Sequence, residues 1–221
     1  MRRIRITLAL FITIFIMAFS VSVSTIETQA ASNTSLITSY LKYFKKGQYK
    51  KARKYIRRMK NNDKDTSLKK MTQKQKNAYY KVLKRYENKY SLSSNGKTVW
   101  GYYLADLNKD RKPELLIEYG GSEADAKTAV YTYKKQKAKK VGSVFSGNTG
   151  YIAYPRKGLL SVYVNMGYCT VSVITMKKGK LKIKKYGSQE TTGEYCIPTN
   201  YLDSHKRYGV YSSYLDYSDL Q

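Results

Sequence analysis

Four oxygen-bearing side chains recur at fixed spacing within one short segment of the chain. Asp106, Asn108 and Asp110 occupy positions 1, 3 and 5 of this segment, and Glu114 occupies position 9. Alternate residues of a tight loop point to the same side, and a hard cation such as calcium takes carboxylate, amide and carbonyl oxygens as ligands. The backbone carbonyl of Lys112, at position 7, completes such a set. The spacing therefore predicts a structural Ca²⁺ site.

This segment resembles the calcium loops of the FG-GAP, VCBS and dockerin families, which follow an Asp-x-Asp-x-Asp-Gly pattern. The resemblance implies that the four side chains are calcium ligands, and the strand-like sequence on each side favours the FG-GAP arrangement. Arg111 stands where these families place the glycine that permits a sharp turn. Lys109, Arg111 and Lys112 also balance the three carboxylates of the segment, which weakens its attraction for a cation. The alternative is a metal-free hairpin turn held by Asp and Asn side chains.

Basic residues far outnumber acidic residues, and their placement is uneven. The chain has 42 Lys and Arg against 15 Asp and Glu, a formal net charge of +27, and residues 134–186 hold 13 basic and no acidic side chains. Two clusters in this segment are candidates for polyanion binding: Lys134, Lys135 and Lys137, and then Lys180, Lys182 and Lys184. The competing interpretations are that these lysines protect exposed sheet edges from aggregation, or that they only keep the protein soluble.

The residue types of common catalytic sites are scarce. The single histidine, His205, lies in a polar segment, and no second residue completes a Cys–His arrangement. We also find no phosphate-binding glycine loop and no nucleophile elbow. Cys169 and Cys196 form either one disulfide of an exported protein or two separate buried thiols. The sequence thus favours a protein without enzymatic activity and keeps an unrecognised hydrolase as an alternative.

The N-terminus has the pattern of an export signal. A basic start is followed by an uncharged stretch over residues 6–26, and small residues stand near Ala30, where a signal peptidase cleaves. We therefore expect residues 1–30 to be a signal peptide and the product to be secreted or attached to the cell surface. An uncleaved membrane anchor is the alternative. Export makes nucleic acid an unexpected partner and favours an anionic cell-wall polymer, an acidic polysaccharide or a membrane surface.

The sequence pattern of the helices and strands that must position these residues predicts an α+β fold. Residues 31–92 are predicted to form a basic bundle of about three helices. Two of these helices lie within 34–60. The third begins near Thr72 and Gln75, which fit a capping box. Residues 93–221 read as an antiparallel β domain. The expected meander has eight strands, at 99–107, 114–119, 128–134, 139–145, 151–154, 159–165, 169–176 and 180–186. Two similar hairpin units, closing at Gly142 and Gly187, repeat within it.

Together these features predict a secreted, non-enzymatic binding module of the cell envelope, with its basic face toward an anionic polymer or membrane. The second hypothesis is a secreted inhibitor or partner of an acidic extracellular protein. As a whole, the chain resembles the small exported proteins of Gram-positive bacteria that carry one Asp-rich loop in a β domain.

Overall fold

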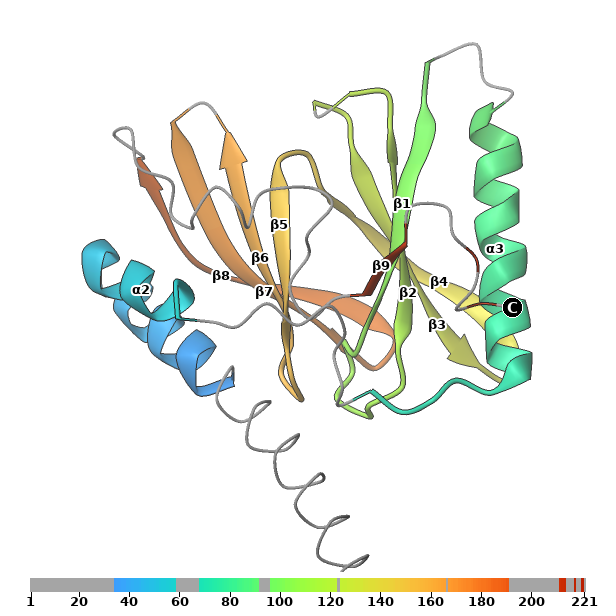
Figure 1. The fold of residues 1–221 in the computed structure, drawn as a ribbon, viewed down its shortest axis with the longest axis horizontal. Helices are drawn as coiled ribbons and strands as arrows, with labels where there is room; N and C mark the ends of the chain where they lie inside the picture. The colour runs from blue at the N-terminus through green and yellow to red at the C-terminus, as the bar shows by residue number, and fades with distance from the viewer. Residues whose placement is uncertain are drawn as a thin grey trace, which may run out of the picture.

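The computed structural model describes residues 34–58, 68–91, 96–122, 124–165, 167–190 and 211–213, together with Tyr217 and Leu220. The predicted signal peptide, Cys196 and His205 lie outside these residues. Within the described part of the chain, no helix is long and apolar enough to cross a membrane. Figure 1 shows the arrangement of the helices and strands.

Helices occupy residues 34–45, Tyr49–Ile56 (α2) and Gln73–Ser91 (α3). Gly47 separates the first two with a φ of 70°, a conformation that costs glycine little. α3 begins after Thr72, whose hydroxyl accepts the backbone N–H of Gln75 at 3.2 Å. This bond is half of the predicted capping box. The side-chain nitrogen of Gln75 donates to the carbonyl oxygen of Pro113 at 3.2 Å.

The strands follow α3 in the order that the alternation of apolar and polar residues predicts. They are β1 (Thr98–Ala105), β2 (Glu114–Gly120), β3 (Lys127–Lys134), β4 (Lys137–Phe145), β5 (Thr149–Tyr154), β6 (Gly158–Asn165), β7 (Tyr168–Lys177) and β8 (Lys180–Glu190). A further short strand, β9 (Tyr211–Ser213), was not expected from the pattern. The α+β class is therefore confirmed.

The eight strands of the expected meander are divided between two antiparallel sheets. One sheet has the order β4-β3-β2-β1-β9 and the other the order β5-β6-β7-β8. The chain changes sheet between β4 and β5, in a tight turn where Thr149 N–H bonds to the carbonyl of Ser146 at 3.2 Å and Asn148 has a φ of 46°. Because β5 pairs with β6 and not with β4, the predicted meander is divided into two meanders of four strands each.

The helices lie on the outer faces of the two sheets, and they do not form one bundle within the described residues. Figure 1 shows α2 at one end of the molecule and α3 at the other, with both sheets between them. Successive residues of a strand point to opposite faces of its sheet. In both sheets, apolar side chains occur on each face, so each face needs a second layer to cover it. Leu116 joins the core between the sheets, whereas its neighbours Leu115 and Ile117 pack with α3. The second sheet likewise buries Ile152 and Leu160 against residues 34–45 and α2.

The two predicted hairpin units correspond to β2-β3-β4 and β6-β7-β8. Each turn between the last two strands has two residues of positive φ, Lys135 and Gln136 in one unit and Lys178 and Gly179 in the other. Positive φ at both central residues matches the right-handed twist of a hairpin. The pairing register shifts just before Gly142 in the first unit and just before Gly187 in the second. The units therefore share strand order, turn geometry and bulge position.

Candidate functional site

The Asp106 loop connects β1 to β2 and is folded by its own side chains. Asp106 accepts the backbone N–H of Lys109 on one carboxylate oxygen, at 2.7 Å, and that of Arg111 on the other, at 3.0 Å. Asn108 and Asp110 each accept the N–H of the residue two positions later, at 2.8 and 2.7 Å. These are the Asx-type bonds that hold a tight turn without help from a ligand.

Arg111 adopts the backbone conformation that the calcium-loop families assign to glycine. Its φ is 68°, and Lys109 has a φ of 74°. The carbonyl of Arg111 accepts the backbone N–H of Lys69 at 2.7 Å, which ties the segment before α3 to the loop. Arg111 therefore forms the sharp turn without a glycine. A residue other than glycine is strained at this positive φ.

Glu114, at the start of β2, is a buried carboxyl group that three donors surround. It is 1% exposed, and it accepts bonds from Leu107 N–H at 2.8 Å, Asn108 Nδ2 at 3.0 Å and Thr132 Oγ1 at 3.1 Å. Burial is the main cause that raises the pKa of Glu114, to about 8, and the charges of Asp110 and Asp106 add to it. The hydrogen bonds act in the opposite direction. Burial thus disfavours the charged form of Glu114, and the surrounding donors favour it.

These contacts bear on the predicted calcium site. The donor set consists of oxygen atoms, as calcium requires, but the carboxylate and amide oxygens are directed at N–H groups of the protein. Among the described residues, no three His, Cys, Asp or Glu side chains gather as a metal site. These bonds are compatible with the metal-free turn, and calcium binding through Asp106, Asn108, Asp110, Lys112 and Glu114 stays a prediction.

The loop also joins three parts of the fold. The side chains of Gln75 and Tyr79 on α3 donate to the carbonyl of Pro113 at 3.2 and 2.9 Å. The backbone N–H of Met176 on β7, in the other sheet, donates to the carbonyl of Leu107 at 2.6 Å. A segment held in this way by α3 and by both sheets has a structural role whether or not it binds an ion.

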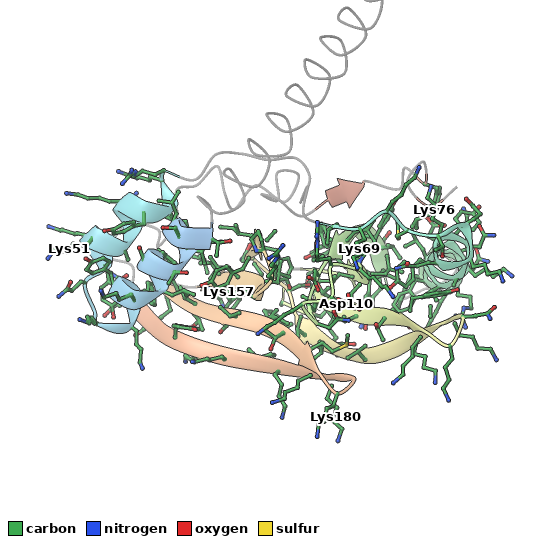
Figure 2. All side chains as sticks on the ribbon, turned by 90° about the horizontal axis from the view of Figure 1, so that it is seen from below. Lys51, Lys69, Lys76, Asp110, Lys157 and Lys180 are labelled. Atoms are coloured by element: carbon green, nitrogen blue, oxygen red, sulfur yellow. The ribbon has the colours of Figure 1, made fainter. Side chains whose placement is uncertain are left out.

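The two predicted lysine clusters lie at the edges of different sheets. Lys134, Lys135 and Lys137 surround the β3–β4 turn, Lys180, Lys182 and Lys184 lie on β8, and all six side chains are exposed. β4 and β8 are the outermost strands of their sheets. The two edges meet where Leu181 of β8 packs on Gly142 of β4, with the Leu181 Cδ1 atom 3.1 Å from the position of a Cβ at residue 142. In Figure 2, Lys180 projects away from the sheets at the lower edge of the view.

Three basic residues of α3 also belong to this region and were not expected from the pattern. Lys74, Lys81 and Arg85 line a groove together with Lys137 of the predicted cluster. Their spacing of seven and four residues places them on one face of the helix. That spacing was the available signal in the sequence, but it does not reveal what lies opposite the helix.

Cys169 lies on β7 and is fully buried. The described part of the chain holds no free cysteine. Because Cys196 lies outside the described residues, the Cys169–Cys196 pairing stays a prediction. Comparison of the chain with family models, with curated proteins and with solved structures finds no match.

Proposed function

We propose that this protein is a secreted, non-enzymatic binding module whose basic face binds an anionic polymer of the cell envelope. The observation that carries the proposal is the contact between Gly142 and Leu181, because it places the edges of the two sheets side by side. Lys137 and the three lysines of β8 thereby lie on neighbouring edge strands, and Lys134 and Lys135 precede Lys137 at the β3–β4 turn. We call this surface the basic face and define it by the six lysines of the two clusters, Lys134, Lys135, Lys137, Lys180, Lys182 and Lys184.

Among the described residues, no acidic side chain pairs with the basic face. None of its six lysines forms an ion pair within the described residues; the pairs Lys84–Glu87 and Lys97–Asp125 lie elsewhere. Residues 134–186 contain no acidic side chain that could neutralise the face from the same segment. Such a field attracts polyanions over long distances and weakens as salt shortens the screening length, which is about 10 Å at 0.1 M.

Protection of the sheet edges is the competing explanation for the same lysines. Both β4 and β8 are edge strands, and lysine on an edge prevents pairing with another chain. The two explanations differ in what they predict for lysine-to-glutamine variants. Loss of polymer binding supports the proposal, whereas aggregation with unchanged binding supports edge protection.

The experiment compares two triple variants of equal charge. The test variant is K180Q/K182Q/K184Q on β8, and the control variant is K50Q/K51Q/K54Q on α2, whose three lysines are also exposed. Figure 2 shows Lys51 at the end of the molecule opposite to Lys76 of α3. Binding to purified wall teichoic acid is measured over a range of salt concentrations.

We expect the β8 variant to lose at least roughly tenfold in affinity and to have a shallower dependence on salt, since each lost phosphate contact lowers that slope. The α2 variant should retain most of the affinity. Equal losses in both variants would show that only net charge matters and would reject a defined face. Saturable binding to an acidic protein with little salt dependence would favour the inhibitor hypothesis.

Export is part of the proposal. Cleavage near Ala30 would release a product that begins at Ala31 and still carries every residue of the basic face. Mass spectrometry of the protein from the culture medium tests this cleavage. Retention of residues 1–30 in a membrane fraction would favour an uncleaved anchor instead.

A further inference from the structure

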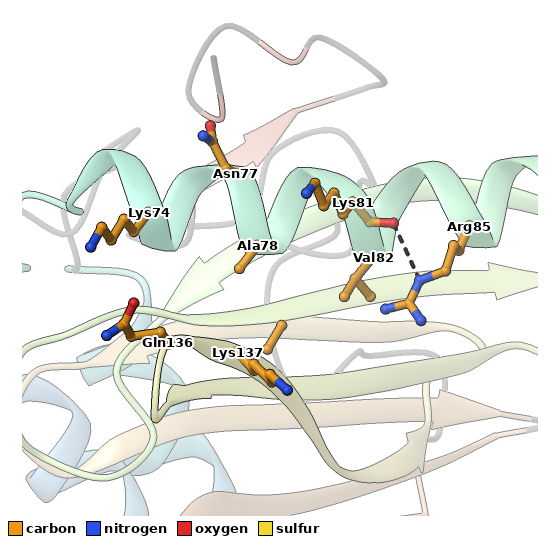
Figure 3. A pocket seen from close by; sticks show the side chains of 9 residues that line it. Lys74, Asn77, Ala78, Lys81, Val82, Arg85, Gln136 and Lys137 are labelled. Atoms are coloured by element: carbon orange, nitrogen blue, oxygen red, sulfur yellow. Dashed lines mark hydrogen bonds between the residues drawn. The ribbon is translucent and has the colours of Figure 1, made fainter.

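A groove runs between α3 and the β3–β4 turn, and its volume is about 540 Å³. Sites of roughly 300–1,000 Å³ are typical of small ligands or short stretches of a longer one. Figure 3 shows α3 as one wall and the turn with Gln136 and Lys137 as the opposite wall. The groove adjoins the basic face because Lys137 belongs to both.

The charged side chains of the groove are all positive. Lys74, Lys81 and Arg85 come from α3 and Lys137 from the opposite wall. None of them forms an ion pair within the described part of the chain, where the ion pair of α3 joins Lys84 to Glu87. The three α3 cations extend over roughly 16 Å along the helix, at 1.5 Å per residue. A row of this length suits several anionic groups in series better than a single ion.

Arg85 contributes a planar guanidinium to the groove. Its Nε donates to the backbone carbonyl of Lys81 at 3.4 Å, the bond drawn in Figure 3. This bond uses Nε and leaves the two terminal nitrogen atoms of the guanidinium for other acceptors. A planar guanidinium matches the oxygens of phosphate in a two-pronged contact, and a lysine ammonium adds a point charge.

The floor of the groove is aliphatic. Ala78 and Val82 of α3 and Ala138 of β4 form it, and no aromatic side chain of the described residues lines the groove. Proteins that bind single-stranded nucleic acid stack the bases on aromatic rings. A groove with cations along its walls and only methyl-bearing side chains beneath them suits a polymer with phosphates and a small aliphatic backbone.

We propose that this groove binds a short stretch of an aliphatic phosphodiester polymer, a polyol phosphate, with its phosphates on Lys74, Lys81, Arg85 and Lys137. This assignment rests on the proposed function and names the class of polymer and the place where it is bound. The lysines of β8 attract the same polymer over a distance, and the groove is the site that binds it.

The test uses the purified protein and fluorescently labelled poly(glycerol phosphate), with binding followed by fluorescence anisotropy. The variant K81Q/R85Q removes two cations of the groove, and K51Q/K54Q removes two exposed cations of α2 as a matched control. Both pairs are exposed helical positions, where glutamine preserves helix formation, so unchanged circular dichroism is expected. We expect K81Q/R85Q to lower the affinity at least tenfold and the salt slope by roughly 0.7 per lost contact.

Two further measurements distinguish a failure of the groove assignment from a failure of the proposed function. If K180Q/K182Q/K184Q weakens binding and K81Q/R85Q does not, the groove assignment is overturned while the proposed function stands. If neither variant weakens binding, both proposals are overturned. Oligothymidylate with the same number of phosphates serves as the nucleic-acid probe, and equal or tighter binding of it through Lys81 and Arg85 would overturn the choice of an aliphatic polymer.

Discussion

Leu181 of β8 packs directly on Gly142 of β4, so closely that a Cβ at position 142 would lie 3.1 Å from the Leu181 Cδ1 atom. Leu181 also packs, half-buried, against the apolar core between the two sheets. A residue with no side chain on one edge strand therefore lets the other edge strand approach. This contact joins the two lysine-bearing edges into the basic face.

Shortening Leu181 should loosen this contact. We expect Leu181→Ala to lower the free energy of unfolding by about 1–2 kcal/mol, less than the 2–5 kcal/mol typical of a fully buried leucine, because the side chain is half-buried. Polymer binding should weaken as well, since the two edges no longer hold a fixed distance. Ile183→Ala on the same strand is the control, because Ile183 is 58% exposed. Urea denaturation measures the first effect, and equal losses in both variants would contradict the assigned role of Leu181.

The hydroxyl of Tyr79 connects α3 to the Asp106 loop, and its removal should have a cost. Tyr79 is fully buried and donates to the Pro113 carbonyl at 2.9 Å. Tyr79→Phe keeps the ring and removes this bond, so we expect a loss of about 1 kcal/mol in the free energy of unfolding. Tyr80→Phe on the same helix is the matched control, because Tyr80 is only half-buried and its ring packs edge-on against Tyr217. An unchanged unfolding curve for Tyr79→Phe would show that the bond contributes nothing.

The side chain of Asp106 should stabilise the protein even without calcium. Asp106 is 4% exposed and accepts two backbone N–H groups, which Asp106→Ala would leave without an acceptor. We expect that variant to lose about 1–3 kcal/mol of stability in the presence of a chelator. Asp106→Asn, which keeps one carbonyl acceptor, should lose less. A smaller effect of the alanine variant than of the asparagine variant would contradict the hydrogen-bonded turn.

Calcium binding at the same loop has a direct test. The calcium hypothesis predicts that millimolar calcium raises the Tm of the wild-type protein and leaves the Tm of Asp106→Ala unchanged, because a ligand that binds only the folded state stabilises it. Magnesium at the same concentration is the control for ionic strength. Identical Tm values for the wild-type protein with and without calcium would remove calcium from the description of this loop.

Acid should remove the contribution of Asp125. Its carboxylate accepts the N–H groups of Ser122 and Gly121 at 2.8 and 2.9 Å and pairs with Lys97 at 3.1 Å. The Ser122 N–H and Lys97 lower the pKa of Asp125 from 3.8 to about 2. A carboxyl group with a lowered pKa in the folded state adds stability above its ordinary pKa and loses that contribution as the pH falls through the lowered value.

We therefore expect Asp125→Asn to melt below the wild-type protein at pH 7, with a difference that shrinks between pH 4 and pH 2. Thermal melts across this range, read by circular dichroism, provide the measurement. A difference that stays constant over the range would show that the charge of Asp125 does not contribute.

Local sequence patterns are sufficient to predict most of the secondary structure. The alternation in residues 180–185 predicts β8, and the hydroxyl of Thr72 caps α3 as its sequence indicates. The Asp106 loop is likewise folded by side chains that lie within a few positions of the N–H groups they bind. Patterns of this kind are readable because the interacting groups are close neighbours along the chain.

The packing of these elements depends on contacts between distant residues, and no local pattern contains it. The turn from Ser146 to Thr149 looks like any other hairpin turn, yet it moves the chain into a second sheet. Tyr79 and Val82 bury their side chains against the first sheet, and this brings Lys81 and Arg85 beside Lys137. Residue types and spacing are enough to predict the strands, the charge distribution and the Asp-rich turn. The basic face and the groove exist only because apolar burial selects which sheet edges and which helix face come together.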